Sequence, residues 1–71
     1  MSMFHNIAGM STNGLKAMQR ATHDRLVEED ALPAGAQKTY GVREFQDWRD
    51  QADEMEAELD RRGETYTKVP W

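Results

Sequence analysis

The second half of the chain carries apolar residues at helical spacing. Between residues 42 and 63 the larger apolar side chains recur every three or four positions, which places them on one face of an α-helix. Arg61 and Arg62 stand where cations favour the carbonyl end of a helix, and Gly63 is typical of the position just past that end. The pattern predicts an amphipathic helix over residues 42–62, with an apolar face formed by Val42, Phe45, Trp48, Ala52, Met55 and Leu59.

A weaker helical pattern precedes this segment. Ser-Thr-Asn at positions 11–13 offers three favourable N-cap residues, and apolar or small residues then recur at helical spacing as far as Leu26. Pro33 cannot occupy a helix interior and disfavours helical geometry in the residue before it. We therefore expect a helix over about residues 13–31, followed by a Pro/Gly-containing linker over residues 32–41. Such a linker allows either a helical hairpin or a more open arrangement of two helices.

The two ends of the chain are apolar but not helical in pattern. Residues 1–10 contain Phe4 and Ile7, which belong either to a frayed start or to a segment that docks on the helices or on a neighbour. Residues 64–71 alternate β-prone and polar residues and finish in Val-Pro-Trp. This tail is expected to be disordered, to pack on the second helix, or to dock into another chain with Trp71 as its anchor. The fold predicted is all-α, as a single small domain with extended segments at both ends.

The small size of the chain limits the core that it builds. A domain of 71 residues buries only about 60% of its unfolded surface, and small domains usually need a disulfide, a metal or another subunit. The chain has no cysteine, which excludes disulfides and thiolate metal sites, and its two histidines, His5 and His23, lie far apart. We expect no metal and no cofactor. Other protein chains, in a homo-oligomer or a larger assembly, are the expected partners.

The residue pattern contains no motif for catalysis. There is no Gly-rich phosphate loop and no nucleophile beside a base, and two helices with short loops build no sheltered site for a general acid. The net charge of −4 argues against a phosphate-binding surface, so no direct contact with nucleic acid is expected. The chain has neither a signal-peptide pattern nor an apolar run of about 18 residues. The sequence therefore predicts a non-enzymatic protein, cytoplasmic or in a virion, that does not bind membranes.

The apolar face of the second helix fits two kinds of contact. It suits the core of a helical hairpin, and it equally suits a coiled-coil or bundle contact between subunits, with Trp48 as an anchor. Together with the apolar ends of the chain, it gives a predicted interface made of Phe4, Ile7, Phe45, Trp48, Met55, Leu59, Tyr66, Val69 and Trp71.

The same helix carries an excess of acidic residues. Every charged residue between Arg49 and Arg61 is Asp or Glu, and like charges four positions apart destabilise a helix by about 0.2–0.5 kcal/mol per pair. These residues form either a solvated face or a surface that meets a basic partner. The predicted acidic face consists of Asp50, Asp53, Glu54 and Glu58.

The order of these parts resembles the small head–tail joining proteins of tailed bacteriophages, the family of the lambda head-completion protein W. The resemblance covers roughly residues 13–71: an amphipathic helix, a joint, the longer helix VREFQDWRDQADEMEAELDRR and an apolar tail. It implies a structural, non-enzymatic virion protein that assembles as a ring, with an end segment that orders on assembly. Members of that family have a β-hairpin between the helices, which LPAGAQKTYG is too short to supply.

The alternative function is a small acidic inhibitor or regulator. In that case the face from Asp50 to Asp60 would occupy a basic, nucleic-acid-binding surface of a host enzyme. Its binding would weaken with salt, because exposed charges are screened beyond about 10 Å at 0.1 M. Replacing Glu54 and Glu58 with Lys would abolish binding by an inhibitor, whereas Trp71→Ala would impair an assembly subunit.

Overall fold

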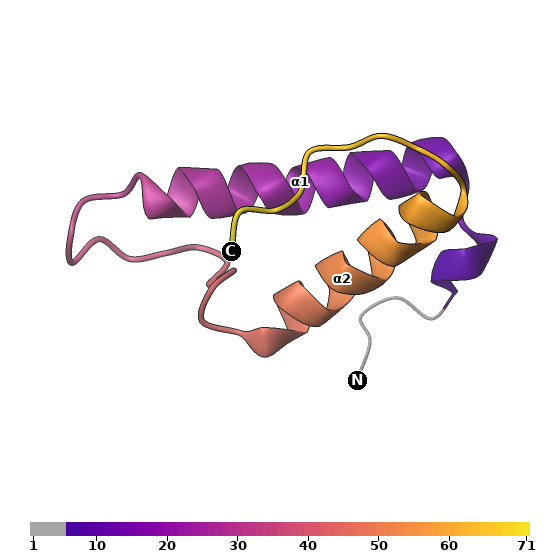
Figure 1. Cartoon of the computed structure of the whole chain (residues 1–71). Helices are drawn as coiled ribbons and strands as arrows, with labels where there is room; N and C mark the ends of the chain where they lie inside the picture. The colour runs from indigo at the N-terminus through magenta and orange to yellow at the C-terminus, as the bar shows by residue number, and fades with distance from the viewer. Residues whose placement is uncertain (1–5) are drawn as a thin grey trace.

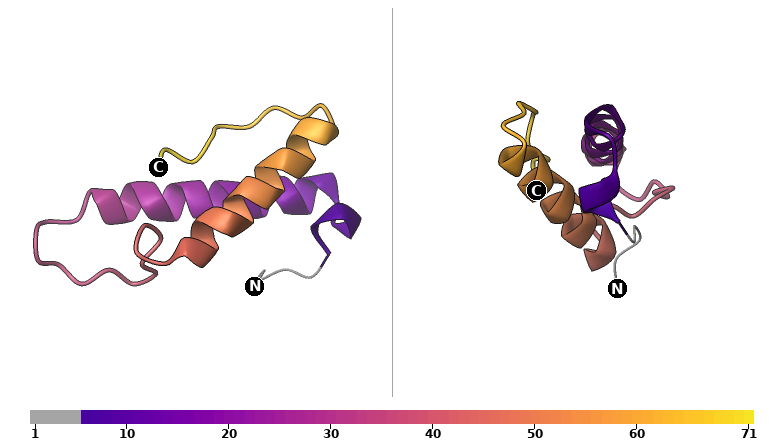
Figure 2. Two further views of the ribbon diagram at one scale, coloured as in Figure 1. Left: turned by 60° about the horizontal axis from the view of Figure 1, so that its bottom comes forward. Right: turned by 90° about the vertical axis from the view of Figure 1, so that its right-hand side faces the viewer.

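The fold consists of two crossed helices and the irregular segments that pack on them. The computed structural model describes residues 6–71, which contain the 3-10 helix η1 (Ile7–Gly9) and the α-helices α1 (Thr12–Asp30) and α2 (Gln46–Arg61). The two α-helices run in opposite directions and cross obliquely (Figures 1 and 2). No strand occurs within the described range. The all-α, two-helix prediction is therefore confirmed.

Helix α1 begins and ends within one residue of the predicted bounds, 13 and 31. The hydroxyl of Ser11 accepts the backbone N–H of Gly14 at 3.0 Å, and the helix stops at Asp30, three residues before Pro33. Its buried face is partly polar, which explains why its apolar pattern is weak. The buried residues of α1 are Leu15, Gln19, Thr22, Leu26 and Glu29.

Helix α2 begins four residues later than the predicted start at Val42. Gly41 has a positive φ of 64°, and its carbonyl accepts the N–H groups of Glu44 and Phe45 in a turn that precedes the helix. The carboxylate of Glu29 accepts three successive backbone N–H groups, those of residues 40–42, and so fixes this turn against α1. Residues 42–45 were therefore wrongly predicted as helix, because a side chain on α1 binds the backbone there.

The buried apolar residues of the described chain fall into two clusters. One joins η1 to the start of α1 and the end of α2, and it consists of Ile7, Leu15, Met55 and Leu59 with Met10, Met18 and Tyr66 around it. The other lies toward the linker and consists of Leu26, Val42, Ala52 and Val69, with Trp48 and Trp71 beside it. Segments from both ends of the chain thus contribute to the core.

The tail, residues 64–71, packs on the helices of its own chain. It leaves α2 at Gly63, which has a φ of 71°, and returns in extended form along the helix pair (Figure 1). The Gln19 amide donates to the Thr67 carbonyl at 2.7 Å, and the N–H of Val69 donates to Glu56 at 3.1 Å. Of the three fates expected for the tail, the structure has packing on the chain itself. Figure 2 shows the tail on one side of the helix pair and the linker on the other.

Candidate functional site

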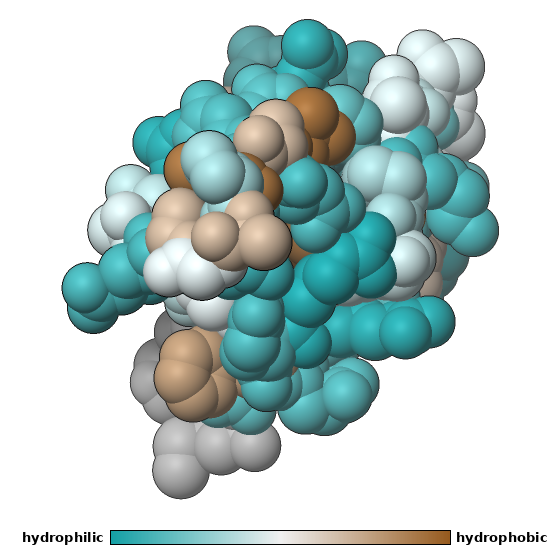
Figure 3. Space-filling view, turned by 90° about the vertical axis from the view of Figure 1, so that its left-hand side faces the viewer, coloured by the Kyte–Doolittle hydropathy of each residue, from teal (hydrophilic) through white to brown (hydrophobic). Residues whose placement is uncertain are grey.

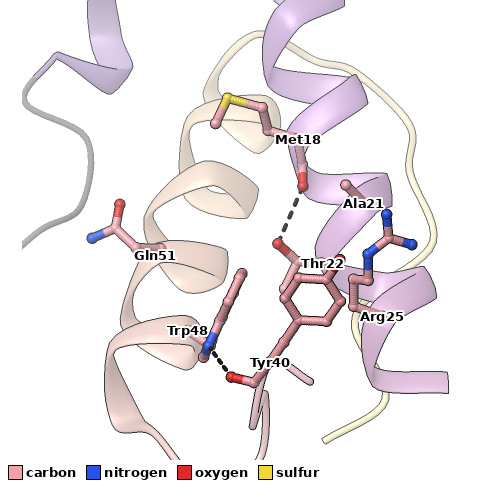
Figure 4. A pocket seen from close by; sticks show the side chains of 7 residues that line it. All are labelled: Met18, Ala21, Thr22, Arg25, Tyr40, Trp48 and Gln51. Atoms are coloured by element: carbon pink, nitrogen blue, oxygen red, sulfur yellow. Dashed lines mark hydrogen bonds between the residues drawn. The ribbon is translucent and has the colours of Figure 1, made fainter. Parts of the chain in front are cut away.

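A hollow of about 290 Å³ opens between the two helices on the linker side. Side chains from α1 form one wall, side chains from α2 the other, and Tyr40 from the end of the linker lies between them (Figure 4). Most of the exposed lining is apolar. We call this site the aromatic hollow; its lining residues are Met18, Ala21, Thr22, Arg25, Tyr40, Trp48 and Gln51.

Two aromatic rings that line the hollow are fixed against each other. Tyr40 and Trp48 meet edge to face, with ring centroids 6.1 Å apart and an interplanar angle of 83°. The indole N–H of Trp48 donates to the carbonyl oxygen of Tyr40 at 3.1 Å. From α1, the guanidinium of Arg25 lies 5.2 Å from the centroid of the Tyr40 ring, a cation–π distance. These contacts hold the rings in place although Tyr40 remains 40% exposed.

The buried carboxylate of Glu29 holds the backbone at Tyr40. Glu29 accepts backbone N–H groups at 2.6 Å from Tyr40, 3.2 Å from Gly41 and 3.0 Å from Val42. Burial alone would raise the pKa of Glu29, but these three hydrogen bonds, aided by the charge of Lys38, hold it below its ordinary value. The carboxylate is therefore ionised at neutral pH and binds the linker as an anion. We call this contact the Glu29 clamp.

Phe45 continues the apolar surface beyond the hollow. Its ring lies against Gly41, where a Cβ atom would come within 2.7 Å of the ring atom Cε2. At 63% exposure it is the most exposed large apolar side chain among residues 6–71. A second, shallower hollow contains both Tyr40 and Phe45, so the two rings border one continuous surface. At this end of the molecule, apolar groups lie among hydrophilic ones (Figure 3), and Leu32 is also exposed.

The predicted interface residues do not form one surface. Ile7, Met55, Leu59 and Val69 are buried within the chain itself, Trp48, Tyr66 and Trp71 are half-buried, and Phe45 is exposed. Phe4 lies outside the described residues. Trp48 and Phe45 border the same open surface, near Tyr40. The expectation that Phe45 lies on the core face of the hairpin is wrong, because Phe45 stands in the turn before α2 and not in the helix.

The aromatic residues of the tail also find partners inside the chain. The hydroxyl of Tyr66 donates to Asp60 at 2.9 Å, and burial together with this bond raises the pKa of Tyr66 to about 12. Trp71 stacks with Arg49, whose guanidinium carbon lies 5.6 Å from the ring centroid. Arg43 donates to the carbonyl oxygens of the last two residues and pairs with Asp30 at 2.9 Å. The end of the tail is thus fixed by polar contacts as well as by Val69.

The acidic face is smaller than the sequence predicts. Asp50, Asp53 and Glu54 are exposed on α2, but Glu58 is buried. Arg61 and Arg62 donate to the Glu58 carboxylate and hold its pKa below the ordinary value. Glu58 is therefore wrongly assigned to the exposed face, because the arginines one turn later on the helix cover it.

Arg62, one of the two arginines that bind Glu58, also ties the end of α2 to the start of the described residues. Arg62, bound to Glu58, donates to the hydroxyl of Thr12 at 3.1 Å and to the carbonyl of Ala8 at 3.0 Å. Glu58 therefore positions a cation that bridges two helices. The Glu58 carboxylate therefore acts within the fold and is not part of the exposed acidic face.

Sequence reasoning missed Met18, Arg25 and Glu29 as parts of the site. A signal existed for Glu29, since it stands three positions after Leu26 and so falls on the predicted apolar face of the first helix. An acid on such a face needs a hydrogen-bonding partner. Met18 falls on the predicted apolar pattern of the first helix, three positions after Leu15, but that pattern does not say what Met18 meets. No signal marks Arg25, because its role depends on the angle at which the helices cross.

Within residues 6–71 no group of three or more His, Asp or Glu side chains is placed to hold a metal ion. No helix in that range is both long and apolar enough to cross a membrane. Comparison with known protein families, curated proteins and solved structures finds no match for this chain.

Proposed function

We propose that this chain is a non-enzymatic assembly subunit that binds other protein chains through the surface formed by the aromatic hollow and Phe45. The observation that carries the proposal is that Phe45 departs from two local preferences at once. It exposes a large apolar ring to solvent, and it occupies the N-cap of α2 without providing a side-chain acceptor. Departures of this kind concentrate at functional sites.

Both departures lower the stability of the free chain. An N-cap residue without an acceptor forgoes about 1 kcal/mol relative to Ser, Thr, Asp or Asn. An exposed Phe side chain forgoes about 1.5–3 kcal/mol of hydrophobic stabilisation. A partner that covers the ring restores the second contribution in the complex. Phe at position 45 is therefore more favourable in a complex, where a partner covers the ring, than in the free chain.

The more specific form of the proposal is a structural part of a phage virion at the head–tail junction. The order of helix, linker, helix and apolar tail supports it, although α2, with 16 residues, is shorter than α1, with 19, and not longer as the resemblance implies. Such a subunit contacts copies of itself in a ring. Because Val69 and Trp71 pack within the chain, we assign the contact between copies to Phe45 and its surroundings instead of the tail.

The variant Phe45→Asp tests this proposal. Aspartate is a favourable N-cap next to the positive end of the helix dipole, so we expect the free energy of unfolding to rise by about 1 kcal/mol in urea denaturation. The same variant should abolish the concentration-dependent self-association expected of the wild type in light scattering after size exclusion. Ala57→Asp, at an exposed position within α2, is the matched control and should leave association unchanged.

Two results would contradict the proposal. A large loss of stability in Phe45→Asp would show that the ring belongs to the core of the single chain. A wild-type chain that remains monomeric at every concentration would exclude assembly with itself, and with it the ring.

The second candidate function is the acidic inhibitor. It is favoured by one observation, the exposure of Asp50, Asp53 and Glu54 along α2. Under it, the double variant Asp50→Lys and Asp53→Lys should lose binding to a basic enzyme surface, and wild-type binding should fall steeply between low and high salt. Salt-resistant association that requires Phe45 would contradict this candidate.

A further inference from the structure

We propose that the aromatic hollow is filled by Phe4 of the same chain, whose ring enters between α1 and α2 and shields the hollow from other partners. Phe4 belongs to residues 1–5, which precede the described part of the chain. Three features carry this inference: the groove that leads from η1 to the hollow, the short stretch of chain between Ile7 and Phe4, and the chemistry of the lining. Docking of Phe4 goes beyond the proposed function and does not depend on association with another copy.

Helix η1 and the hollow occupy successive parts of one groove between the helices. Helix η1 lies on the linker side of the helix pair, which is the side on which the hollow opens (Figure 2). There Ile7 of η1 is buried in a cluster with Met55 and Leu59 of α2. Met18 of α1 packs against this cluster and also lines the hollow. The groove that Ile7 fills at one end therefore continues into the hollow.

The chain from Ile7 to Phe4 is long enough to reach the hollow. On α2, the lining residues Gln51 and Trp48 stand four and seven positions before Met55, which is about 6 and 10 Å along the helix at about 1.5 Å per residue. Three residues in extended form span up to about 10 Å. Because burial of Ile7 fixes one end of this stretch, the ring of Phe4 is present at a high effective concentration beside the hollow.

The lining of the hollow suits an aromatic ring. Its volume of about 290 Å³ exceeds the roughly 150 Å³ of an apolar cavity that binds benzene. The rings of Tyr40 and Trp48 offer edge-to-face contacts, and the sulfur of Met18 offers a contact to a ring edge (Figure 4). The hydroxyl of Thr22 is already engaged, since it donates to the Met18 carbonyl at 3.2 Å. An apolar ring therefore enters without leaving this donor unpaired.

The other aromatic side chains have places elsewhere in the fold. The chain contains two tryptophans, two tyrosines and two phenylalanines. Of these, one tyrosine and one tryptophan line the hollow, one of each belongs to the tail, and Phe45 lies in the turn before α2. Phe4 is the remaining aromatic residue. Its burial in the hollow recovers hydrophobic stabilisation that a second phenylalanine in water would forgo.

Docking of Phe4 divides the proposed binding surface into two parts. Phe45 stays exposed and meets a partner directly, whereas the hollow opens only when Phe4 leaves it. A partner that covers both parts must therefore displace Phe4. The segment before Ile7 is thus an internal competitor for the same site.

A double-mutant cycle on the full-length chain in dilute solution tests this inference. Phe4→Ala should raise the equilibrium constant for unfolding in urea by about tenfold or more, which corresponds to about 1.4 kcal/mol, and the neighbouring control His5→Ala by less than about twofold. In the background Ala21→Arg, where a long side chain occupies the hollow, Phe4→Ala should change the constant by less than about twofold. Ala57→Arg adds the same charge at an exposed position outside the lining and should leave the tenfold effect intact, to within about twofold.

Nuclear Overhauser contacts locate the ring directly. In the variant Phe45→Asp, Phe4 is the single phenylalanine of the chain. Its ring protons should show contacts with the methyl group of Met18 and the indole of Trp48. The same variant removes the side chain to which we assign association between copies, so these contacts report on the single chain.

Three outcomes would overturn the inference. The first is the absence of these contacts in Phe45→Asp. The second is an effect of Phe4→Ala that is equal with and without Ala21→Arg, which would mean that Phe4 packs outside the hollow. The third is contacts that arise only between differently labelled copies, which would assign the hollow to Phe4 of a second copy. None of the three depends on self-association of the wild type, so the inference and the proposed function can fail separately.

Discussion

At the scale of single residues, buried glutamates hold the segments that are not helical. Glu29 binds the backbone at the end of the linker, and Glu56 accepts hydrogen bonds from the Gln19 amide and from the backbone N–H of Val69 in the tail. Glu58 binds the arginines at the end of α2. Hydrogen bonds to an ionised acceptor are stronger than neutral ones. Part of the acidic excess of the chain is therefore structural and not available to a partner.

Replacing the Glu29 carboxylate tests the clamp. The variant Glu29→Gln keeps the shape of the side chain but removes the charge that accepts three backbone N–H groups. We expect the free energy of unfolding at neutral pH to fall by about 1.5–3 kcal/mol in urea denaturation. Glu28→Gln, at the exposed neighbouring position, is the matched control and should change it by less than about 0.5 kcal/mol.

The difference between wild type and Glu29→Gln should depend on pH. The pKa of Glu29 in the folded chain lies below its ordinary value of 4.5, so the clamp contributes fully above pH 4.5 and is lost as the pH falls through the lowered value. The two proteins should therefore become equally stable in strong acid. A difference that persists unchanged there, or an equal effect of Glu28→Gln at neutral pH, would contradict the clamp.

At the scale of elements, apolar spacing predicted the helices but not the turn between them. The helical spacing of apolar residues includes Val42 and Phe45, but these residues lie before α2 in a segment that is not helical. The segment is not helical because Glu29 on α1 binds its backbone. That contact joins residues more than ten positions apart, so local spacing does not contain it. Polar residues buried on α1, such as Gln19, weakened its pattern without preventing the helix.

The candidate site was predictable only in part. Trp48 stood out as an anchor because it is a large aromatic residue in the middle of an apolar face. Its neighbours in the hollow, Met18 and Ala21, lie beside the buried face of α1, and the crossing of the helices decides whether they meet Trp48. The sequence leaves that crossing open, since the linker allows several arrangements.

The turn before α2 should be sensitive to a side chain at Gly41. Both Gly41 and Gly35 have positive φ angles, 64° and 85°, which cost other residues about 1–2 kcal/mol. Gly41 is buried with its N–H bound by Glu29, whereas Gly35 lies in the exposed part of the linker, where an added Cβ atom would meet nothing within 4 Å. We therefore expect Gly41→Ala to lower the melting temperature more than Gly35→Ala. Equal shifts would show that the turn relaxes freely.

At the scale of the whole molecule, two clusters and the returning ends make one core from a short chain. Ile7 enters the cluster at one end of the helix pair, and Val69 enters the cluster at the other. The small size of the chain led us to expect that association with another subunit stabilises it. Burial of Ile7 and Val69 within the chain itself supplies part of that stabilisation. The sequence shows that the tail is apolar. It does not show whether the tail packs on its own helices or on a neighbour, because that depends on the contacts of Gln19 and Glu56 with the tail backbone.

Truncating a single side chain in the tail tests whether it belongs to the core of the isolated chain. Val69 is 5% exposed, and Val69→Ala should lower the free energy of unfolding by about 1.5–3 kcal/mol, measured in dilute solution. Lys68→Ala, at the exposed preceding position, should change it by less than about 0.5 kcal/mol. Equal stability of the two variants would indicate that the tail contributes only in a complex.

The polar contacts to the linker and the tail have a consequence for how this sequence can change. Glu29, Gln19, Glu56 and Arg43 bind backbone atoms of those segments, and backbone atoms are the same whatever side chain follows. The side chains at the exposed positions 34, 36, 37, 65, 67 and 68 can therefore change while the fold persists. The surface of the molecule can therefore vary in evolution or by design, as long as these four polar residues and the apolar contacts of Val69 are kept.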